Sequence, residues 1–269
     1  MLLGVVQGLT EFVPVSSTAH LYLVQALLGI RNDEIALSFD IVLHLGTAAA
    51  LILATWPQLT AIILETLLWL ARRPARDPEA RTLVLPIVIG TVPGVLAGLF
   101  LLKRFETMRS PALIGIAMLV ASAFFLAAER LGTSRSQPER ALGSLGALDA
   151  IWIGLAQAAA GLFAGLSRSG FTISVGRLRG FRREDAARFS FLLALPIILG
   201  AGARALLDLR KHPSPSVGAA VLAAGFLASA VTGYFAVGFL LRFLKTHSLR
   251  PFALYLALLG AALLVFRPS

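Results

Sequence analysis

Apolar runs long enough to cross a bilayer alternate along this chain with short polar connections. About 20 apolar residues in a helix span the hydrocarbon core of a membrane, so each such run predicts one transmembrane helix. Six runs follow this pattern: Ile35–Trp56, Thr82–Leu102, Pro111–Ala128, Arg188–Leu209, Val217–Leu241 and Phe252–Phe266. Pro86 and Pro93 are expected to break the second run. Pro57–Leu70 is a shorter apolar stretch, either a surface helix or an extension of the first span.

The segment Gly4–His20 departs from this pattern because polar side chains interrupt its apolar surroundings. Gln7 and Glu11 are four residues apart, so a helix places both on one face. Pro14 is expected to end that helix, because a proline lacks the N–H that a helix interior needs. The segment therefore predicts a helix that enters the apolar region and stops at a turn.

Three hydroxyl residues follow this turn and predict a second, returning helix. Ser16, Ser17 and Thr18 are typical residues for capping a helix start. His20 lies three residues after Ser17, on the same face of the predicted helix. A helix N-terminus with free N–H groups and hydroxyls can bind an anion. A simpler alternative is a capped helix-turn-helix whose Glu11 and His20 face water.

A second copy of this arrangement favours a functional site. Gly154–Gln157 aligns with Gly4–Gln7 at an offset of 150 residues, and Ser167 then falls at the position of Ser17. The further correspondences are Phe189 with Phe39, Leu193 with Leu43, and Pro251 with Pro111. Each half would hold one hairpin and three spans, and because three is odd, the halves cross the membrane in opposite directions. We therefore predict an all-α polytopic membrane protein, a single domain with an inverted-topology repeat (about 1–130 and 150–269), six transmembrane helices and two re-entrant hairpins.

The second hairpin carries an arginine at its tip. Ser167 and Ser169 can cap the returning helix, Thr172 lies one turn further, and Arg168 offers a planar fork of donors that suits phosphate oxygens. A charged arginine at membrane depth is costly, which favours a functional role. The alternatives are that Arg168 extends to the interface or pairs with Glu11 for structural reasons alone.

Composition supports a membrane protein and excludes several other classes. Hydrophobic residues make up 57% of the chain and charged residues only 14%, as in polytopic membrane proteins. The net charge of +10 comes from arginines in short connections, which set topology and contact anionic headgroups. Nucleic acid is therefore not an expected partner, and the basic connection Arg72–Arg81 is expected in the cytoplasm. The chain has no cysteine, which excludes thiolate catalysis and cysteine-bound metals.

The two tips together suit a lipid phosphate or diphosphate. Arg168 and the helix N-termini would hold the anion, and Glu11 with Gln7 would bind a divalent cation that prefers oxygen ligands, such as Mg²⁺ or Ca²⁺. A hydroxyl, Ser17 in particular, or water would attack phosphorus, and the base could be His20 or Glu11. His44 interrupts an apolar span and is expected to be a packed or bundle-facing residue rather than a ligand.

These motifs resemble the undecaprenyl-diphosphatase family of the bacitracin-resistance type. The first family motif, (Glu/Gln)-x-x-x-Glu, is present as Gln7–Glu11, and the second, Pro-Gly-x-Ser-Arg-Ser-x-x-Thr, as Gly165–Thr172. The sequence departs from the family at Gln7, where glutamate is frequent, and at Ala164, where the family has proline. The first departure leaves one carboxylate for a metal, and the second makes the turn less rigid.

The resemblance implies a metal-dependent enzyme that hydrolyses undecaprenyl diphosphate to the monophosphate and inorganic phosphate. This reaction recycles the lipid carrier of peptidoglycan synthesis and confers bacitracin resistance. The enzyme would lie in the bacterial plasma (inner) membrane with its site facing outward. The implied roles are metal and diphosphate binding for Gln7 and Glu11, nucleophile for Ser17, proton transfer for His20 and phosphate binding for Arg168. Residues expected to support the substrate are Ser16, Thr18, Ser167, Ser169 and Thr172.

Two alternatives use the same architecture. A polyprenyl-phosphate flippase or anion transporter would also contain inverted repeats with re-entrant hairpins, but it needs no nucleophile beside a base. A membrane assembly factor without catalysis would not need Glu11 and Arg168 in a bilayer. The partners expected are the lipid diphosphate and membrane lipids, and the sequence leaves open whether two copies form a homodimer.

Overall fold

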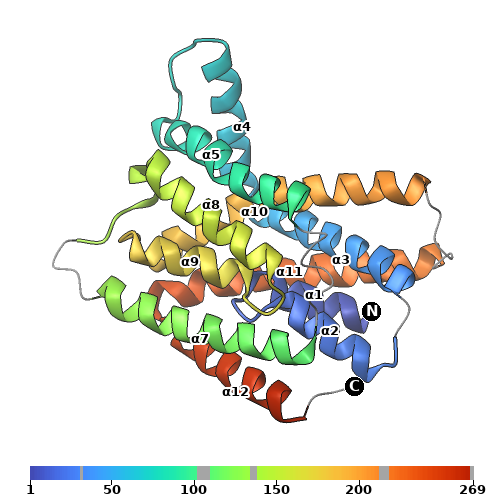
Figure 1. Ribbon diagram of the computed structural model, residues 1–269. Coiled ribbons are helices and arrows are strands. Elements are labelled where there is room, and N and C mark those ends of the chain that lie inside the picture. Colours follow the sequence, from blue (N-terminus) through green and yellow to red (C-terminus); the bar gives the residue numbers. More distant parts are fainter. Residues whose placement is uncertain (31–32, 102–109, 134–137, 212–217, 267–269) are drawn as a thin grey trace.

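The computed structural model is a bundle of α-helices (Figure 1). It describes residues 1–30, 33–101, 110–133, 138–211 and 218–266. Its helices are α1 (Leu2–Phe12), α2 (Ser17–Leu27), α3 (Asp33–Ala54), α4 (Trp56–Leu70), α5 (Pro78–Phe100), α7 (Pro111–Thr133), α8 (Ala147–Leu162), α9 (Arg168–Leu178), α10 (Arg183–Lys211), α11 (Ala219–Thr246) and α12 (Arg250–Phe266), with a short 3₁₀ helix at Leu142–Ser144. The prediction of an all-α polytopic membrane protein is confirmed.

Four helices of the described chain are long and apolar enough to cross a membrane, namely α5, α7, α10 and α11. The other two predicted spans correspond to α3 and to the shorter apolar helix α12. The stretch Pro57–Leu70 forms most of α4, which turns away from α3 by 83° after Ala54. Many large apolar side chains on the outer surface are exposed, as lipid contact requires.

The prediction that prolines break the second span is wrong. α5 continues through Pro86 and Pro93 from Pro78 to Phe100. Proline is tolerated inside membrane helices because neighbouring helices and local adjustments satisfy the freed backbone groups. The close packing of α5 against α8 supplies such a neighbour.

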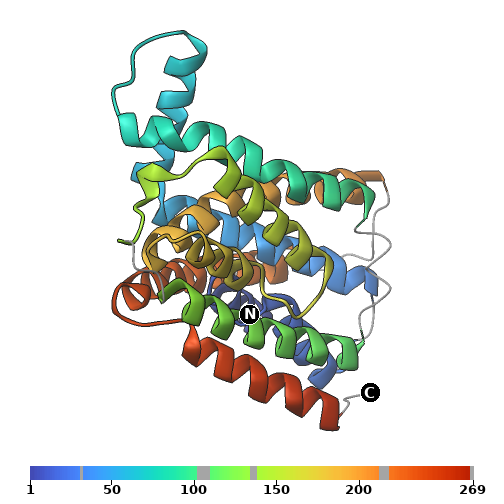
Figure 2. The ribbon, with the colours of Figure 1, turned by 60° about the vertical axis from the view of Figure 1, so that its left-hand side comes forward.

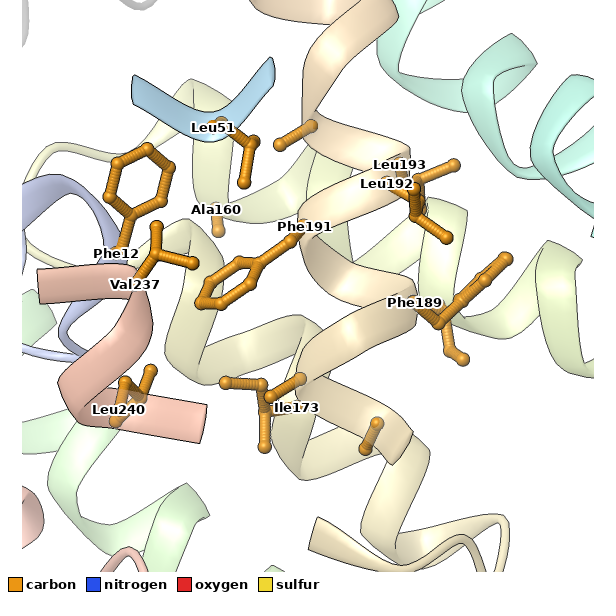
Figure 3. Packing of buried hydrophobic residues seen from close by; sticks show 14 of the residues in the cluster. Phe12, Leu51, Ala160, Ile173, Phe189, Phe191, Leu192, Leu193, Val237 and Leu240 are labelled. Carbon is orange, nitrogen blue, oxygen red and sulfur yellow. The ribbon is translucent and has the colours of Figure 1, made fainter. Parts of the chain in front are cut away.

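The two hairpins enter the bundle from opposite ends (Figure 2). In Figure 1 the N-terminus of α1 lies at the end that also holds the C-terminus, whereas in both views α8 starts at the end that holds α4. The hairpins meet at a buried apolar core, where the ring of Phe12 from α1 packs edge-on against Phe191 of α10 at 5.4 Å (Figure 3). Val237 of α11 lies beside these two rings in the same core.

Glycines bring the first helix of each hairpin into close contact with a spanning helix. A Cβ added to Gly4 would lie 2.5 Å from the carbonyl oxygen of Gly225 in α11, and one added to Gly154 would lie 2.4 Å from that of Gly90 in α5. Small residues allow membrane helices to approach this closely. Gly4 and Gly154 are 150 residues apart, and each lies against the backbone of a spanning helix.

The hairpin tips differ by one residue. Ser16 and Ser167 precede the returning helices and both have left-handed backbone angles, with φ of 70° and 61°. The second tip therefore contains one additional residue, and Ser167 corresponds to Ser16 rather than to Ser17. Ser17 and Arg168 are each the first residue of their helix. The alignment of Ser167 with Ser17 made from the sequence is wrong for this reason.

Candidate active site

The first hairpin places a carboxylate beside a hydroxyl. α1 ends at Phe12, and Val13 is extended, as expected for the residue before a proline. This turn brings the start of α2 back to α1, so that Ser17 Oγ donates a 2.6 Å hydrogen bond to Glu11 Oε2. Gln7 Nε2 donates to the same oxygen at 3.0 Å from one turn earlier in α1. The predicted face that Gln7 and Glu11 share is confirmed.

The second hairpin contributes the positive charge. Arg168 Nη2 donates to Glu11 Oε1 at 2.6 Å, across the boundary between the two halves of the chain. The Glu11 side chain is only 8% exposed and that of Arg168 16%. Arg168 Nη1 is buried without a hydrogen-bond partner. A buried donor without a partner is uncommon, and this nitrogen could donate to an anionic ligand.

His20 does not contact the Ser17 hydroxyl through a hydrogen bond. Its Nδ1 lies 2.8 Å from the carbonyl oxygen of Ser16, and its Nε2 lies 2.6 Å from the hydroxyl of Tyr255 in α12. The rings of His20 and Tyr255 are also stacked, with centroids 5.6 Å apart. Ser16 O can only accept, so Nδ1 carries the proton of the neutral ring and Nε2 accepts from Tyr255.

The predicted hydroxyl residues hold the tips together in different ways. Ser16 Oγ lies 3.2 Å from Thr18 Oγ1, and Ser16 makes no side-chain cap, so this part of the capping prediction is wrong. Ser167 does cap α9, because its Oγ accepts from the N–H of Gly170 at 3.4 Å. Its hydroxyl is also 3.5 Å from that of Ser169.

Thr172 lies below the tip rather than in it. Its hydroxyl is fully buried and contacts the carbonyl oxygens of Arg168 and Ser169 in the preceding turn of α9. Its Oγ1 is 2.5 Å from Oγ of Ser190 in α10. Thr172 therefore fixes α9 against α10 and positions Arg168 indirectly.

Three residues near the site were not among the predicted site residues. His44 Nε2 in α3 lies 3.8 Å from Glu11 Oε2, so this histidine, expected to be packed or bundle-facing, faces the bundle interior. Tyr255 and Ser190 lie on α12 and α10, far along the chain from the motifs that they support. The signal in the sequence for these three residues is that each is a polar residue in an apolar run. Many polar residues in such runs only bond to the backbone of their own helix, so this signal does not identify a site residue.

Glu11 is the carboxylate that this site offers to a metal ion. In the part of the chain that the structure describes, no group of three or more His, Cys, Asp or Glu side chains could hold a metal ion, so a cation would need other donors as well. Gln7 Oε1, however, is buried without a hydrogen-bond partner. An unused amide oxygen beside a carboxylate is a suitable donor for a divalent cation.

Comparison with known proteins places the chain in a family. The family model described as Bacitracin resistance protein BacA matches residues 1–262. The chain belongs to this family. A protein named undecaprenyl-diphosphatase from Rubrobacter xylanophilus is 44% identical over 98% of this chain and 97% of its own length. Proteins with the same name from Geotalea daltonii and Alcanivorax borkumensis are 40% and 41% identical, each over 98% of this chain and 96% of the relative. Membership of the BacA family thus extends over both hairpins and all the spanning helices.

Proposed function

We propose that this membrane enzyme hydrolyses undecaprenyl diphosphate to undecaprenyl phosphate and inorganic phosphate. The observation that carries the proposal is the meeting of Ser17, Glu11 and Arg168, in which two hairpins supply a nucleophile, a base and an anion-binding group. The names of the BacA-family relatives support the same substrate. The reaction returns the lipid carrier to peptidoglycan synthesis, and the family description implies bacitracin resistance.

Ser17 is the proposed nucleophile and Glu11 its base. The Ser17 proton already points to Glu11 Oε2, whereas both ring nitrogens of His20 have other partners. As Ser17 Oγ bonds to the terminal phosphorus, its proton moves to Glu11, and the anhydride P–O bond breaks to release undecaprenyl phosphate. Water then attacks the phosphoserine, restores the Ser17 hydroxyl and releases inorganic phosphate.

Arg168 and the helix N-termini are the proposed phosphate-binding groups. Arg168 Nη1 is the unused donor, and the first N–H groups of α2 and α9 lie at the two tips. These groups oppose the negative charge that spreads over the phosphoryl oxygens in the transition state. Ser16, Thr18 and Ser169 would add hydroxyl donors at the tips.

His20 is proposed to move protons at the edge of the site together with Tyr255. The pair lines an apolar cavity of about 400 Å³ between the first hairpin and helices α11 and α12. Its other walls include Leu9, Val13 and Phe239. A wide apolar cavity next to a polar site fits a substrate with a long hydrocarbon chain and a charged head. We assign the isoprenoid chain to this cavity.

A divalent cation fits the donors beside Ser17. Glu11 and the unused Gln7 Oε1 would hold it, and phosphate oxygens of the substrate would complete its coordination, as is common for Mg²⁺. Such a cation supplies Lewis-acid stabilisation of phosphoryl oxygens. The chain's own contribution is to hold the carboxylate in place through Gln7, Ser17 and Arg168.

The positive-inside rule supports an outward-facing first hairpin in the plasma membrane. One end of the bundle, which holds α4 and the start of α8, carries most of the 24 Lys and Arg residues. The described ones are Arg72, Arg73, Arg76, Arg81, Arg130, Arg140, Arg177, Arg179, Arg182, Arg183, Arg188, Arg242, Lys245 and Arg250. We assign this end to the cytoplasm. The hairpin with Ser17, which enters from the other end, then opens to the outer side.

Phosphate release from undecaprenyl diphosphate by purified protein in detergent tests the proposal. We expect release by the wild type that falls with chelator, and loss of release in Arg168→Ala. An Arg182→Ala variant, changed at an exposed position between α9 and α10, is the matched control and should keep full activity. A folded wild type that binds undecaprenyl phosphate but releases no phosphate would contradict the proposal.

A further inference from the structure

His44 has the geometry of a metal ligand rather than of a packed residue. Its Nδ1 lies 2.8 Å from the carbonyl oxygen of Asp40, one turn earlier in α3. The carbonyl can only accept, so this nitrogen carries the proton of the neutral ring and Nε2 keeps its lone pair. Histidines that bind metals usually donate their other N–H in this way, which fixes the ring and its tautomer.

The free nitrogen of His44 faces the carboxylate of the site. Nε2 is 3.8 Å from Glu11 Oε2, too far for a hydrogen bond but a separation that two ligands of one cation can have with a small shift. Gln7 Nε2 and Ser17 Oγ converge on the same oxygen of Glu11. The His44 side chain is 33% exposed, so it can reach a ligand without leaving a packed position.

His20, the other histidine near the site, has no free nitrogen. Both of its ring nitrogens have partners within 2.8 Å. Gln7 offers the remaining unused oxygen, because its Oε1 is buried without a partner. A cation between these groups would therefore find one carboxylate, one amide oxygen and one imidazole.

We propose that His44 is a nitrogen ligand of the divalent cation, together with Glu11 and Gln7. The inference rests on the cation site proposed above and specifies its chemistry. Imidazole favours transition ions such as Mn²⁺ over Mg²⁺ and Ca²⁺, which prefer oxygen. With histidine at position 44, the proposed site would therefore bind a transition ion more tightly than it binds Mg²⁺.

Electron spin-echo spectroscopy of the full-length protein loaded with Mn²⁺ tests this directly, without substrate. We expect modulation from a directly bound ¹⁴N nucleus in the wild type and its loss in His44→Gln, which keeps a polar side chain but removes the imidazole. The matched control is His20→Gln, which should keep the modulation. Mn²⁺ affinity should fall at least about tenfold in His44→Gln, while Mg²⁺ affinity stays within a factor of two.

Isotope labelling of the wild type tests for a histidine ligand even if the His44→Gln variant does not fold. In wild-type protein grown with ¹⁵N-histidine, the ¹⁴N signal should be replaced by a ¹⁵N signal. Modulation that persists in a folded His44→Gln, or its absence in a wild type that binds Mn²⁺, overturns the proposal for His44. Failure of the wild type to bind Mn²⁺ overturns the cation site as well. Phosphate release that is insensitive to chelator would then show that the phosphatase assignment stands without it.

Discussion

Glu11 and Arg168 are 157 residues apart in the chain and form a 2.6 Å ion pair where the two hairpins meet. The pair uses one carboxylate oxygen and one guanidinium nitrogen. Glu11 Oε2 remains in contact with the Ser17 hydroxyl, and Arg168 Nη1 remains without a partner. The ion pair therefore leaves free the two groups that the proposed mechanism uses, Glu11 Oε2 as base and Arg168 Nη1 as anion donor.

Replacement of Arg168 by lysine tests the role of the second guanidinium nitrogen. Lysine keeps the charge that faces Glu11 but cannot donate to Glu11 and to a phosphate as a planar fork. We expect kcat/KM for phosphate release to fall about 10²–10³-fold, as when one preorganised donor is removed. Arg182→Lys, at an exposed position, should behave as the wild type. Near-normal activity of Arg168→Lys would mean that charge alone suffices.

Removal of the Ser17 hydroxyl tests the covalent route. We expect Ser17→Ala to lose about 10³-fold or more of kcat, because no other group takes over nucleophilic attack. Acid quenching of the wild type with substrate labelled in the terminal phosphate should trap label on Ser17. Thr60→Ala, on α4 outside the site, is the control. If Ser17→Ala kept near-normal turnover while His20→Ala abolished it, water rather than Ser17 would attack phosphorus.

Replacement of Gln7 by glutamate restores the pattern that is frequent in the family. A second carboxylate beside Glu11 raises the affinity for a divalent cation and repels Glu11 when no cation is present. We expect the Mg²⁺ concentration for half-maximal phosphate release to fall about tenfold. Thermal unfolding with chelator should begin at a lower temperature than in the wild type. An unchanged Mg²⁺ dependence would remove Gln7 from the cation site.

Two glycines of α8 provide a matched test of the close contact with α5. A Cβ at Gly154 would lie 2.4 Å from Gly90 O, whereas one at Gly161 would meet no atom within 4 Å. We expect Gly154→Ala to lower stability by about 1–3 kcal/mol through overpacking. Gly161→Ala should raise it by about 0.5–1 kcal/mol, because alanine restricts the unfolded chain. Thermal unfolding in detergent measures both, and equal effects would contradict the contact.

The Asp149 carboxyl in the first turn of α8 predicts a pH dependence of stability. Burial alone would raise the pKa of the Asp149 carboxyl, but hydrogen bonds from Arg140, from a backbone N–H and from Arg179 hold it below the ordinary 3.8. A lowered folded pKa stabilises the protein above pH 3.8, and this contribution disappears as the pH falls through the folded value. Asp149→Asn should therefore lower Tm at pH 7 by roughly 5 °C. The difference from the wild type should shrink below pH 3.8, and a constant difference would contradict this origin.

The sequence predicted the parts of the site that lie close together in the chain. Pro14 and the spacing of Gln7 and Glu11 were sufficient to predict the end of α1 and its polar face. His44 and Tyr255 could not be predicted in this way, because they reach the site from α3 and α12 through packing. A single polar residue in an apolar helix carries no information about which neighbour it meets.

The alignment of the tips failed for a different reason. The second tip is one residue longer than the first, but the connection after α9 is one residue shorter than that after α2. The two changes cancel, so the offset of 150 residues holds for α1 with α8 and again for Phe39 with Phe189. Matching residues on both sides conceals the shift, and only the backbone angles of Ser16 and Ser167 reveal it.

The shared position of Ser17 and Arg168, each first in its returning helix, means that a pair of similar hairpins has acquired two unlike chemical duties. In the proposed mechanism, one hairpin carries the nucleophile and its base, and the other carries the arginine that binds the phosphate. In this mechanism neither half is a catalyst by itself, because the nucleophile and the anion-binding group come from different halves. The chain is thus comparable to a heterodimer whose two subunits are joined by a linker. Because the halves belong to one chain, two different halves are always present together.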